Sequence, residues 1–338
     1  MSKRLVICCD GTWNKPDQKD KTTNVVYTAR AVLPVDPEGV PQVVFYDRGV
    51  GTGNVLDRFS GGAFGKGIST NIQDAYRFIV HNYEAGDELY FFGFSRGAYT
   101  VRSTAGLIRN AGVLKKANAD RIADAYALYR GESKPSDRAS IEFREQFSHE
   151  PRVHFIGVWD TVGSLGVPVS GLRFLTKGKY QFHDVQLSSH VDHAYHALAI
   201  DERRGPFAPT LWTCPKDAPN QSVEQVWFAG VHSNIGGGYP DRGLSDQALV
   251  WMIEKAQGAG LAFDPEIVGG CAPDPRGVLE NSKTGFYFLT RAHHRYIGAV
   301  SRPTAESVHP SALERRSADP YYHPENLENH LKREAGSG

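Results

Sequence analysis

The most informative absence from this chain of 338 residues is any long hydrophobic run. Its apolar runs fall well short of the roughly 18 residues that a membrane-spanning helix needs. The segment Met1-Ser2-Lys3-Arg4 leads into only five apolar residues, too few for the core of a signal peptide. We therefore expect a cytoplasmic protein with no integral membrane segment. This expectation is compatible with signal-independent secretion and with peripheral contact to lipid.

An excess of charge of either sign is also missing. The chain has 38 Lys and Arg residues against 38 Asp and Glu residues, so its formal net charge is zero. Proteins that bind nucleic acid draw much of their affinity from an excess of positive charge. The charge balance therefore argues against nucleic acid as a partner, and it gives no indication of an oligomeric state.

Cysteine is scarce, with four residues in the chain. Cys8 and Cys9 are adjacent inside an apolar run, whereas Cys214 and Cys271 lie far apart. This spacing contains neither the CxxC pair of a zinc site nor a disulfide framework. Thiols inside an apolar run usually pack as small hydrophobic side chains. We expect free thiols and no zinc site built from cysteine.

Glycine, by contrast, is abundant, at 35 of the 338 residues. An ordinary globular protein has about 7% glycine, so the share here is high. Glycine is required where the backbone turns sharply or approaches another group closely. The positions of the glycines therefore point toward segments with special backbone geometry.

Short β-rich runs alternate with helical patterns, which predicts a mostly parallel sheet covered by helices on both faces. Several runs are almost continuously apolar, as strands buried on both faces are. The predicted strands are Arg4–Cys9, Gln42–Tyr46, Glu88–Phe94, Val153–Trp159 and Glu224–Val231. Helical spacing of apolar residues predicts four helices: one capped by Ser69 and ended before Gly86, one over Ala98–Ala111, one over Ile122–Tyr129, and one capped by Ser245 that contains Leu249–Ala256.

We predict a single domain over residues 1–338, with two segments that fit the alternation poorly. Residues 164–222 contain no clean strand and are predicted to form a lid-like insertion over one end of the sheet. Residues 272–338 are rich in Pro, Arg and His and are predicted to wrap the surface. Aromatic side chains of the insertion could line an acyl pocket or form plain core; they are Phe174, Tyr180, Phe182, Tyr195, Phe207 and Trp212.

One motif indicates chemistry. Gly93-Phe-Ser95-Arg-Gly97 matches the G-x-S-x-G pattern of a nucleophile elbow, and it joins a predicted strand to a predicted helix. The sharp turn projects the serine hydroxyl above the carboxyl end of the sheet. The backbone N–H of Arg96 would face a developing oxyanion, assisted by the helix dipole. Ser95 is therefore the predicted nucleophile, and Arg96 a predicted oxyanion donor.

A nucleophilic serine needs a base and an acid that orients the base, and in this fold the chain order is Ser, acid, His. Asp160 directly follows a predicted buried strand, at the edge where sites of α/β proteins are built. His232 follows the last predicted strand and precedes the triplet Gly236–Gly238, which can fold tightly enough to place the imidazole beside Ser95. These positions predict Asp160 as the acid and His232 as the base.

A second oxyanion donor is expected from a loop after an early strand. We favour the loop after the first strand, with the N–H of Gly11 or Thr12 as donor. The loop after the second strand would shape the acyl or leaving-group side, and its Gly49-x-Gly51-x-Gly53 spacing does not match a nucleotide-binding fingerprint. The candidate substrate-binding residues are Asp10, Trp13, Gly51, Thr52 and Asn234.

Two other function classes stay open at this point. Asp10, Asp160 and His232 all end predicted strands and could converge as ligands of a metal-dependent phosphoesterase. The segment His183–His196 is rich in histidine but has no H-E-x-x-H spacing, so we interpret it as surface or supporting histidines. A non-catalytic binding module on the same fold is the third interpretation.

The charge run Asp201–Arg204 has two interpretations as well. Dense runs of mixed charge usually form a solvated or salt-bridged face. Alternatively, Arg203 or Arg204 would line the entrance of the site and meet an anionic head group.

Six blocks together resemble a known family. They are Asp10–Asn14, Gly49–Thr52, Gly93–Ala98, Gly157–Val162, Ala197–Arg203 and Gly230–Tyr239, in this order. Within about residues 4 to 260 the chain resembles the uncharacterised α/β-hydrolase family that includes the phospholipase effectors of bacterial type VI secretion. Position 234 is Asn where that family often has Asp. The chain also has no counterpart of the large membrane-associating region of such effectors, so we expect a stand-alone intracellular hydrolase.

The resemblance implies a doubly wound α/β-hydrolase fold and a serine esterase or lipase in which Ser95, Asp160 and His232 fill the triad positions. Together with the motifs, it leads to the expected function: cleavage of a small-molecule or lipid ester through an acyl-enzyme, without a cofactor.

Overall fold

The computed structural model describes residues 2–11, 21–49, 61–131, 133–162, 186–214, 218–284, 292–298 and 304–336, and the side chains of 61–66 are not among them. Trp13, Thr12, Gly51 and Thr52 of the predicted site lie outside these ranges, as do Phe174, Tyr180 and Phe182 of the predicted insertion.

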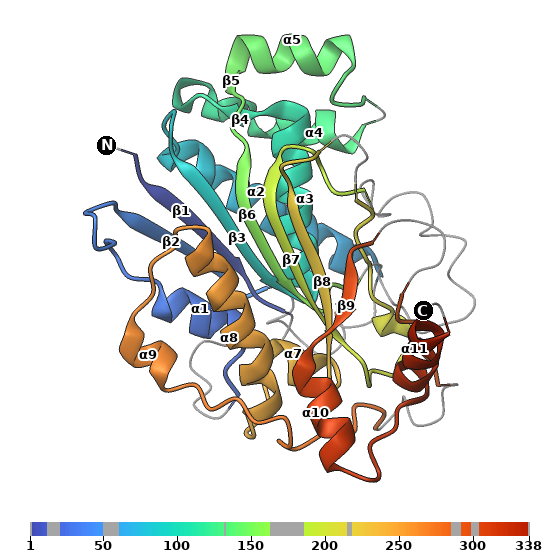
Figure 1. Cartoon of the computed structure of the whole chain (residues 1–338). Helices are drawn as coiled ribbons and strands as arrows, with labels where there is room; N and C mark the ends of the chain where they lie inside the picture. Colours follow the sequence, from blue (N-terminus) through green and yellow to red (C-terminus); the bar gives the residue numbers. More distant parts are fainter. Residues whose placement is uncertain are drawn as a thin grey trace.

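A parallel sheet of seven strands is the centre of the described structure (Figure 1). Its strand order is β2-β1-β3-β6-β7-β8-β9, and each neighbouring pair is parallel. The strands are β1 Arg4–Cys9, β2 Gln42–Asp47, β3 Glu88–Phe94, β6 Val153–Trp159, β7 Val191–Ala199, β8 Ser222–Phe228 and β9 Glu306–Val308. The predicted α/β-hydrolase class is therefore confirmed, with three strands bounded as predicted and two within three residues.

Helices cover both faces of the sheet (Figure 1). On one face, α2 (Gly61–Asn82), α3 (Arg96–Ala111) and α4 (Ile122–Arg130) contribute to a core with Leu5, Ile7 and Phe91 of the strands. On the other face, α1 (Asn24–Ala31) and α8 (Gly243–Gly258) pack over Phe92, Phe155 and Trp159. Both faces of each central strand are thus buried, which explains why those strands are almost continuously apolar in sequence.

Other elements complete the described chain. They are β4 Val113–Leu114 paired antiparallel with β5 Ser148–His149, η2 Lys116–Arg121, α5 Arg138–Phe147, η3 Gly205–Phe207, α7 His232–Gly236, α9 Pro265–Gly269, α10 Pro310–Ala318 and α11 Glu325–Ala335. Among the described residues, no helix is long and apolar enough to cross a membrane.

Both helix caps predicted from serine are wrong. α2 begins at Gly61, so Ser69 lies inside the helix, where its carbonyl accepts a hydrogen bond from Gln73. α8 begins at Gly243, and the Ser245 hydroxyl donates to the carbonyl of Arg242 instead of accepting from an N–H group. The apolar periodicity located each buried face, but it carries no information about the residue at which the first turn of the helix begins.

The prediction of a strandless insertion over residues 164–222 is wrong for β7, which lies within the sheet between β6 and β8. β7 was not recognised because its sequence, Val-Asp-His-Ala-Tyr-His-Ala-Leu-Ala, mixes polar and apolar residues. His196 is nevertheless fully buried in it. Tyr195 and Trp212, predicted for an acyl pocket or core, are also buried, in contact with Trp251 and His196 respectively.

Residues 272–338 do more than wrap the surface, which corrects a second prediction. β9 extends the sheet beside β8. Ile297, Ala312 and Leu327 form a third buried cluster with Leu198 and Trp227 of the central strands. This segment therefore belongs to the core of the fold as well as to its surface.

The thiols of Cys8 and Cys9 are free and fully buried, as predicted. Burial raises the pKa of each thiol well above its ordinary value, since a thiolate is poorly solvated there. Both cysteines therefore act as small hydrophobic side chains of β1.

The loops after β1 and β3 meet where the strand order changes direction, the place at which doubly wound sheets form their sites. Gly97 makes this meeting possible: a Cβ atom at position 97 would lie 1.9 Å from the carbonyl oxygen of Cys9. A Cβ at Gly93 would lie 2.6 Å from Cα of Ala98. The two glycines of the G-x-S-x-G motif are therefore required by backbone packing.

This packing predicts that Gly97→Ala lowers the free energy of unfolding by at least about 2 kcal/mol, the upper range for overpacking a rigid site. Urea denaturation followed by circular dichroism measures the change. Gly258→Ala is the matched control, because nothing lies within 4 Å of a Cβ built there, and its stability should equal or slightly exceed that of the wild type. Equal stability of the two variants would contradict the close approach.

Candidate active site

Ser95 occupies a strained turn between β3 and α3. Its backbone angles, φ 56° and ψ −115°, lie outside the regions that residues with a side chain usually adopt. Its N–H donates to the carbonyl of Trp159 at 3.0 Å, which continues the pairing of β3 with β6 into the turn. Backbone strain of this kind is held in place by surrounding structure and concentrates at functional sites.

Ser95, His232 and Asp160 form one chain of hydrogen bonds. His232 Nε2 lies 2.8 Å from Ser95 Oγ, and His232 Nδ1 lies 2.5 Å from Asp160 Oδ2. The carboxylate accepts from the Nδ1–H, which leaves Nε2 as the acceptor for the serine hydroxyl. The three residues singled out in the sequence thus converge, although 137 positions separate Ser95 from His232.

Asp160 is the most enclosed member of this chain. It lies directly after β6 with a positive φ of 40°, and its N–H donates to the carbonyl of Ala197. Its carboxylate is fully buried and accepts hydrogen bonds from His232, from the N–H of Ala199 at 3.0 Å and from both terminal nitrogens of Arg295, at 2.6 and 2.9 Å. All of its acceptor positions are therefore used within the protein.

The charge state of Asp160 follows from these contacts. Burial alone would raise the pKa of the carboxyl, but the charge of Arg295 and the hydrogen bonds from His232 and Arg295 hold that pKa well below its usual range. Asp160 is therefore ionised at neutral pH.

His232 begins the short helix α7, four residues beyond the end of β8. Its ring packs between Phe94, at a centroid distance of 4.6 Å, and Phe207, at 4.9 Å. Burial lowers the pKa of the imidazole, although the hydrogen bond to Asp160 and the charges of Asp160 and Glu202 oppose that shift. A neutral imidazole with an acceptor Nε2 is the form that can take a proton from a serine.

Glu202 supports His232 from the other side, which sequence reasoning missed. Its side chain is fully buried and accepts the backbone N–H of His232 at 3.2 Å. Arg204 binds both oxygens of this carboxylate and stacks over Phe207, 3.6 Å from the ring centroid. The run Asp201–Arg204 is therefore only partly a solvated face, since Glu202 faces the site. Glu202 lies within Ala197–Arg203, one of the six blocks that resemble the family, and this position was the signal in the sequence that could have indicated a role in the site.

His196 of β7 fixes the turn that follows Asp160. Its Nε2 accepts the N–H of Thr161 at 3.1 Å, and its Nδ1 donates to Gln225 at 3.2 Å. Burial lowers the pKa of His196 to about 3, so the ring stays neutral and keeps the tautomer that these bonds require. The histidine-rich segment thus holds one supporting histidine of the site.

The loop after β1 places Asp10 and Gly11 beside the elbow. A Cβ on Gly97 would approach the carbonyl of Asp10 to 2.6 Å. The Asp10 carboxylate accepts from Thr23 at 2.6 Å, from Tyr46 at 2.9 Å and from the N–H of Gly11 at 2.6 Å. Asp10 thereby fixes the conformation of the loop. The N–H of Gly11 already donates to the Asp10 carboxylate, and its role as an oxyanion donor stays a prediction.

Asn234 is buried and holds the backbone of the loop after β8. Its amide oxygen accepts from the N–H groups of Val231 and Glu280, and its amide nitrogen donates to the carbonyl of Val278. These contacts tie α7 to the segment that follows α9. The substrate contact predicted for Asn234 stays a prediction, and the contacts present are structural.

The residues considered as metal ligands already have hydrogen-bond partners within the protein. Asp160 is bound by Arg295 and Asp10 by Thr23 and Tyr46. Among the residues that the structure describes, no group of three His, Cys, Asp or Glu side chains is arranged to hold a metal ion.

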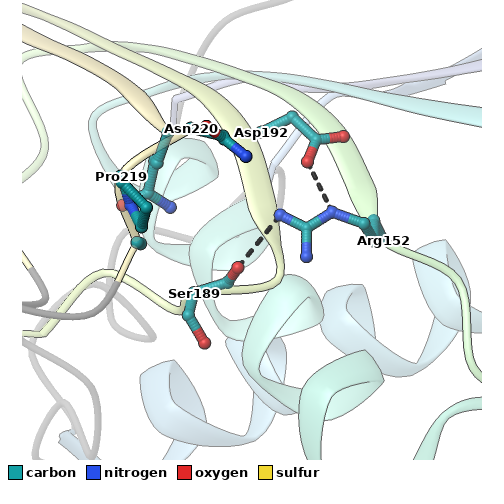
Figure 2. Close-up of a pocket in the computed structure, with 7 residues that line it drawn as sticks. Arg152, Ser189, Asp192, Pro219 and Asn220 are labelled. Atoms are coloured by element: carbon teal, nitrogen blue, oxygen red, sulfur yellow. Dashed lines mark hydrogen bonds and ion pairs between the residues drawn. The ribbon is translucent and has the colours of Figure 1, made fainter.

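A hollow lies at the end of the sheet opposite to these residues (Figure 2). It lies before β6, β7 and β8 and is lined in part by Arg152, Ser189 and Asp192. Arg152 donates to the Asp192 carboxylate at 2.5 Å and to the Ser189 carbonyl at 3.0 Å. Among the lining residues that the structure describes, Arg152 carries the positive charge, and that charge is already paired with Asp192.

The pairing of Asp160 with Arg295 predicts that Asp160→Asn lowers the free energy of unfolding by about 3–5 kcal/mol, because it leaves a buried guanidinium without a counter-charge. Urea denaturation measures the loss, and Asp160→Asn combined with Arg295→Met should recover part of it. Glu328→Gln, which weakens the partly exposed pair with Arg316, is the control and should cost at most about 1 kcal/mol. Losses of equal size in the two single variants would refute this account.

This chain is similar to known proteins in sequence and in fold. Residues 3–255 match the model of the family described as the catalytic domain of Tle1-like phospholipase effectors of the type VI secretion system. An uncharacterised protein of Saccharomyces cerevisiae, YEL023C, is 28% identical over 62% of this chain and 33% of its own length.

Two solved structures are similar at low identity. An uncharacterised protein from Pseudomonas aeruginosa has a TM-score of 0.49 and 17% identity, over 79% of this chain and 47% of its own. A Tle1 effector bound to the VgrG spike of the type VI secretion system has a TM-score of 0.40 and 21% identity, over 70% of this chain and 51% of its own. The chain therefore spans about a third to a half of these relatives. By the match over residues 3–255, it belongs to the family of Tle1-like phospholipase effector catalytic domains.

Proposed function

We propose that this protein is a serine hydrolase that cleaves carboxylic esters of lipids through Ser95, His232 and Asp160. The observation that carries the proposal is the hydrogen-bond chain from Ser95 Oγ to His232 Nε2 and from His232 Nδ1 to Asp160, on a strained turn at the carboxyl end of a parallel sheet. Membership of a family described as phospholipase effectors supports a lipid ester as the substrate class.

The reaction proceeds in two halves. Ser95 Oγ attacks the ester carbonyl while its proton passes to His232 Nε2, and the tetrahedral intermediate then expels the alcohol, which takes that proton. An acyl group now esterifies Ser95. Water, deprotonated by His232, attacks this acyl-enzyme and releases the carboxylic acid, with the proton returning to Ser95. Asp160 stays ionised throughout and stabilises the imidazolium that forms twice.

The oxyanion of each intermediate needs backbone donors. Arg96 is the first residue of α3, so its N–H belongs to the positive end of a 16-residue helix that begins next to the nucleophile. The second donor of the proposal comes from the loop after β1, which packs against Gly97. No cofactor takes part in the proposed reaction.

A metal-dependent phosphoesterase is the less well supported alternative. A carboxylate ligand needs a free lone pair for the metal, whereas the Asp160 oxygens already accept four hydrogen bonds, two of them from a cation. A non-catalytic module is also poorly supported, since a strained Ser95 would have no use there.

The proposal predicts that Ser95→Ala lowers kcat/KM for the best of a series of nitrophenyl esters, and for a phospholipid, by at least about 1000-fold. Hydrolysis should also continue in the presence of a chelator. Ser245→Ala is the matched control, because the hydroxyl of this buried serine of α8 donates to the carbonyl of Arg242 and is not part of the triad, so the rate should stay unchanged. Equal rates for Ser95→Ala and the wild type would exclude the mechanism, and loss of activity on chelation would favour the metal enzyme.

The lowered pKa of His232 predicts the pH dependence. The imidazole must be neutral to act as base, and a folded-state pKa below the usual value of about 6.5 keeps it neutral to lower pH. We expect kcat/KM to be constant between about pH 7 and 8 and to fall only as the pH drops below about 6.5. Initial rates in buffers of constant ionic strength measure this profile. We call the fall of kcat/KM at low pH the acid limb of the profile. An acid limb centred above pH 7 would be inconsistent with a buried, unprotonated His232.

A further inference from the structure

We infer that Arg295 is a positioning residue of the proposed active site, holding Asp160 oriented and ionised so that His232 stays an unprotonated base. The inference rests on the proposed function. Arg295 lies forty residues beyond the end of the family match at residue 255, in a segment that carried no catalytic motif. It therefore adds a group from the C-terminal part of the chain to a site built by the matched part.

The contacts of Arg295 are those of a fixed, two-pronged clamp. One terminal nitrogen donates to Asp160 Oδ1 at 2.6 Å and to the Ala199 carbonyl at 2.8 Å. The other donates to Asp160 Oδ2 at 2.9 Å and to the Phe207 carbonyl at 2.5 Å. Side chains of both Arg295 and Asp160 are fully inaccessible to solvent. Paired parallel bonds to a carboxylate fix its plane as well as its position.

Fixing that plane also orients the base. Asp160 Oδ2 receives both the Arg295 bond and the Nδ1–H of His232, so the direction of the carboxylate sets the direction of the imidazole. The Phe207 carbonyl bound by Arg295 belongs to the residue whose ring packs edge-on against His232. The clamp thus reaches the histidine by two routes.

The positive charge has a second effect. An ionised Asp160 attracts a proton onto His232, and a cation on the same carboxylate weakens that attraction. Removing Arg295 therefore makes protonation of the Asp160–His232 pair easier, which moves the acid limb of activity to higher pH. A proton shared by two coupled groups belongs to the pair, so the sign holds whichever of them carries it.

Other charges face the pair and stay in place when Arg295 is replaced. Glu202 and Arg204 lie on the His232 side, from the segment after β7. His196 of β7 lies beneath the turn after Asp160, with Arg102 of α3 stacked on the Trp212 ring beside it. Since these groups are common to all variants below, they do not account for a difference between them.

The experiment compares the wild type with Arg295→Met and Arg295→Lys. Arg315→Met and Arg315→Lys are matched controls, because Arg315 is also buried in the C-terminal part but donates to the carbonyls of Pro275 and Gly277, away from the triad. The readouts are the pH profile of kcat/KM on a nitrophenyl ester and the pH profile of Ser95 labelling by a fluorophosphonate. Circular dichroism and urea denaturation check folding.

We expect Arg295→Met to move the acid limb upward by about one pH unit or more, with partial recovery of rate at high pH. Arg295→Lys keeps the charge but loses the fork, so its acid limb should stay near that of the wild type while kcat falls at least about tenfold. The Arg315 variants should change stability without moving the limb. An unmoved limb in folded Arg295→Met would overturn the inference.

If Arg295→Met does not fold, Arg295→Lys decides. A kcat equal to that of the wild type then overturns the inference, and a tenfold loss that Arg315→Lys does not share supports it. Failure of the proposed function is recognised separately, since the wild type itself would then neither hydrolyse esters nor be labelled at Ser95.

Discussion

The buried carboxylate of Asp160 is the group on which the arrangement of the site depends. Moving an ionised carboxylate out of water costs several kcal/mol unless charged and hydrogen-bonding partners replace the solvent. Here the partners are His232 from the loop after β8, the Ala199 N–H at the end of β7 and Arg295 from the C-terminal segment. Because these partners are distant in sequence, one carboxylate couples the end of β7 to the loop after β8 and to the C-terminal segment.

The strained residues sit where the sheet can support them. Ser95 and Asp160 both have positive φ. Ser95 directly follows β3, and Asp160 directly follows β6. The N–H of Ser95 donates to Trp159, and the N–H of Asp160 donates to Ala197, so the ladder from β3 to β6 to β7 continues into the turns. Cores on both faces of these strands keep the edge rigid. Rigidity of this kind is what a preorganised site needs.

Elements with a strong local pattern were predictable. β1, β3 and β6 are buried on both faces and have the bounds that were expected. A short, almost continuous apolar run is typical of a parallel strand that helices cover on both faces. β7 was not predictable from its sequence, because a histidine does not by itself indicate burial. The burial of His196 depends on its hydrogen bonds to Thr161 and Gln225, which are distant in sequence. Arg295 gave no signal for a similar reason: nothing in its neighbourhood in sequence distinguishes a clamp on Asp160 from an exposed arginine.

The sequence by itself determined the class of fold, the elbow around Ser95 and the chain order that singled out Asp160 and His232, because each depends on local pattern or on the geometry of parallel strands. Only the tertiary structure decided which charges surround them. Burial of Glu202, the tautomer of His196 and the ion pair between Arg295 and Asp160 are set by contacts between distant segments. The energy of such contacts depends on desolvation and distance, and neither is written in the order of residues along a chain.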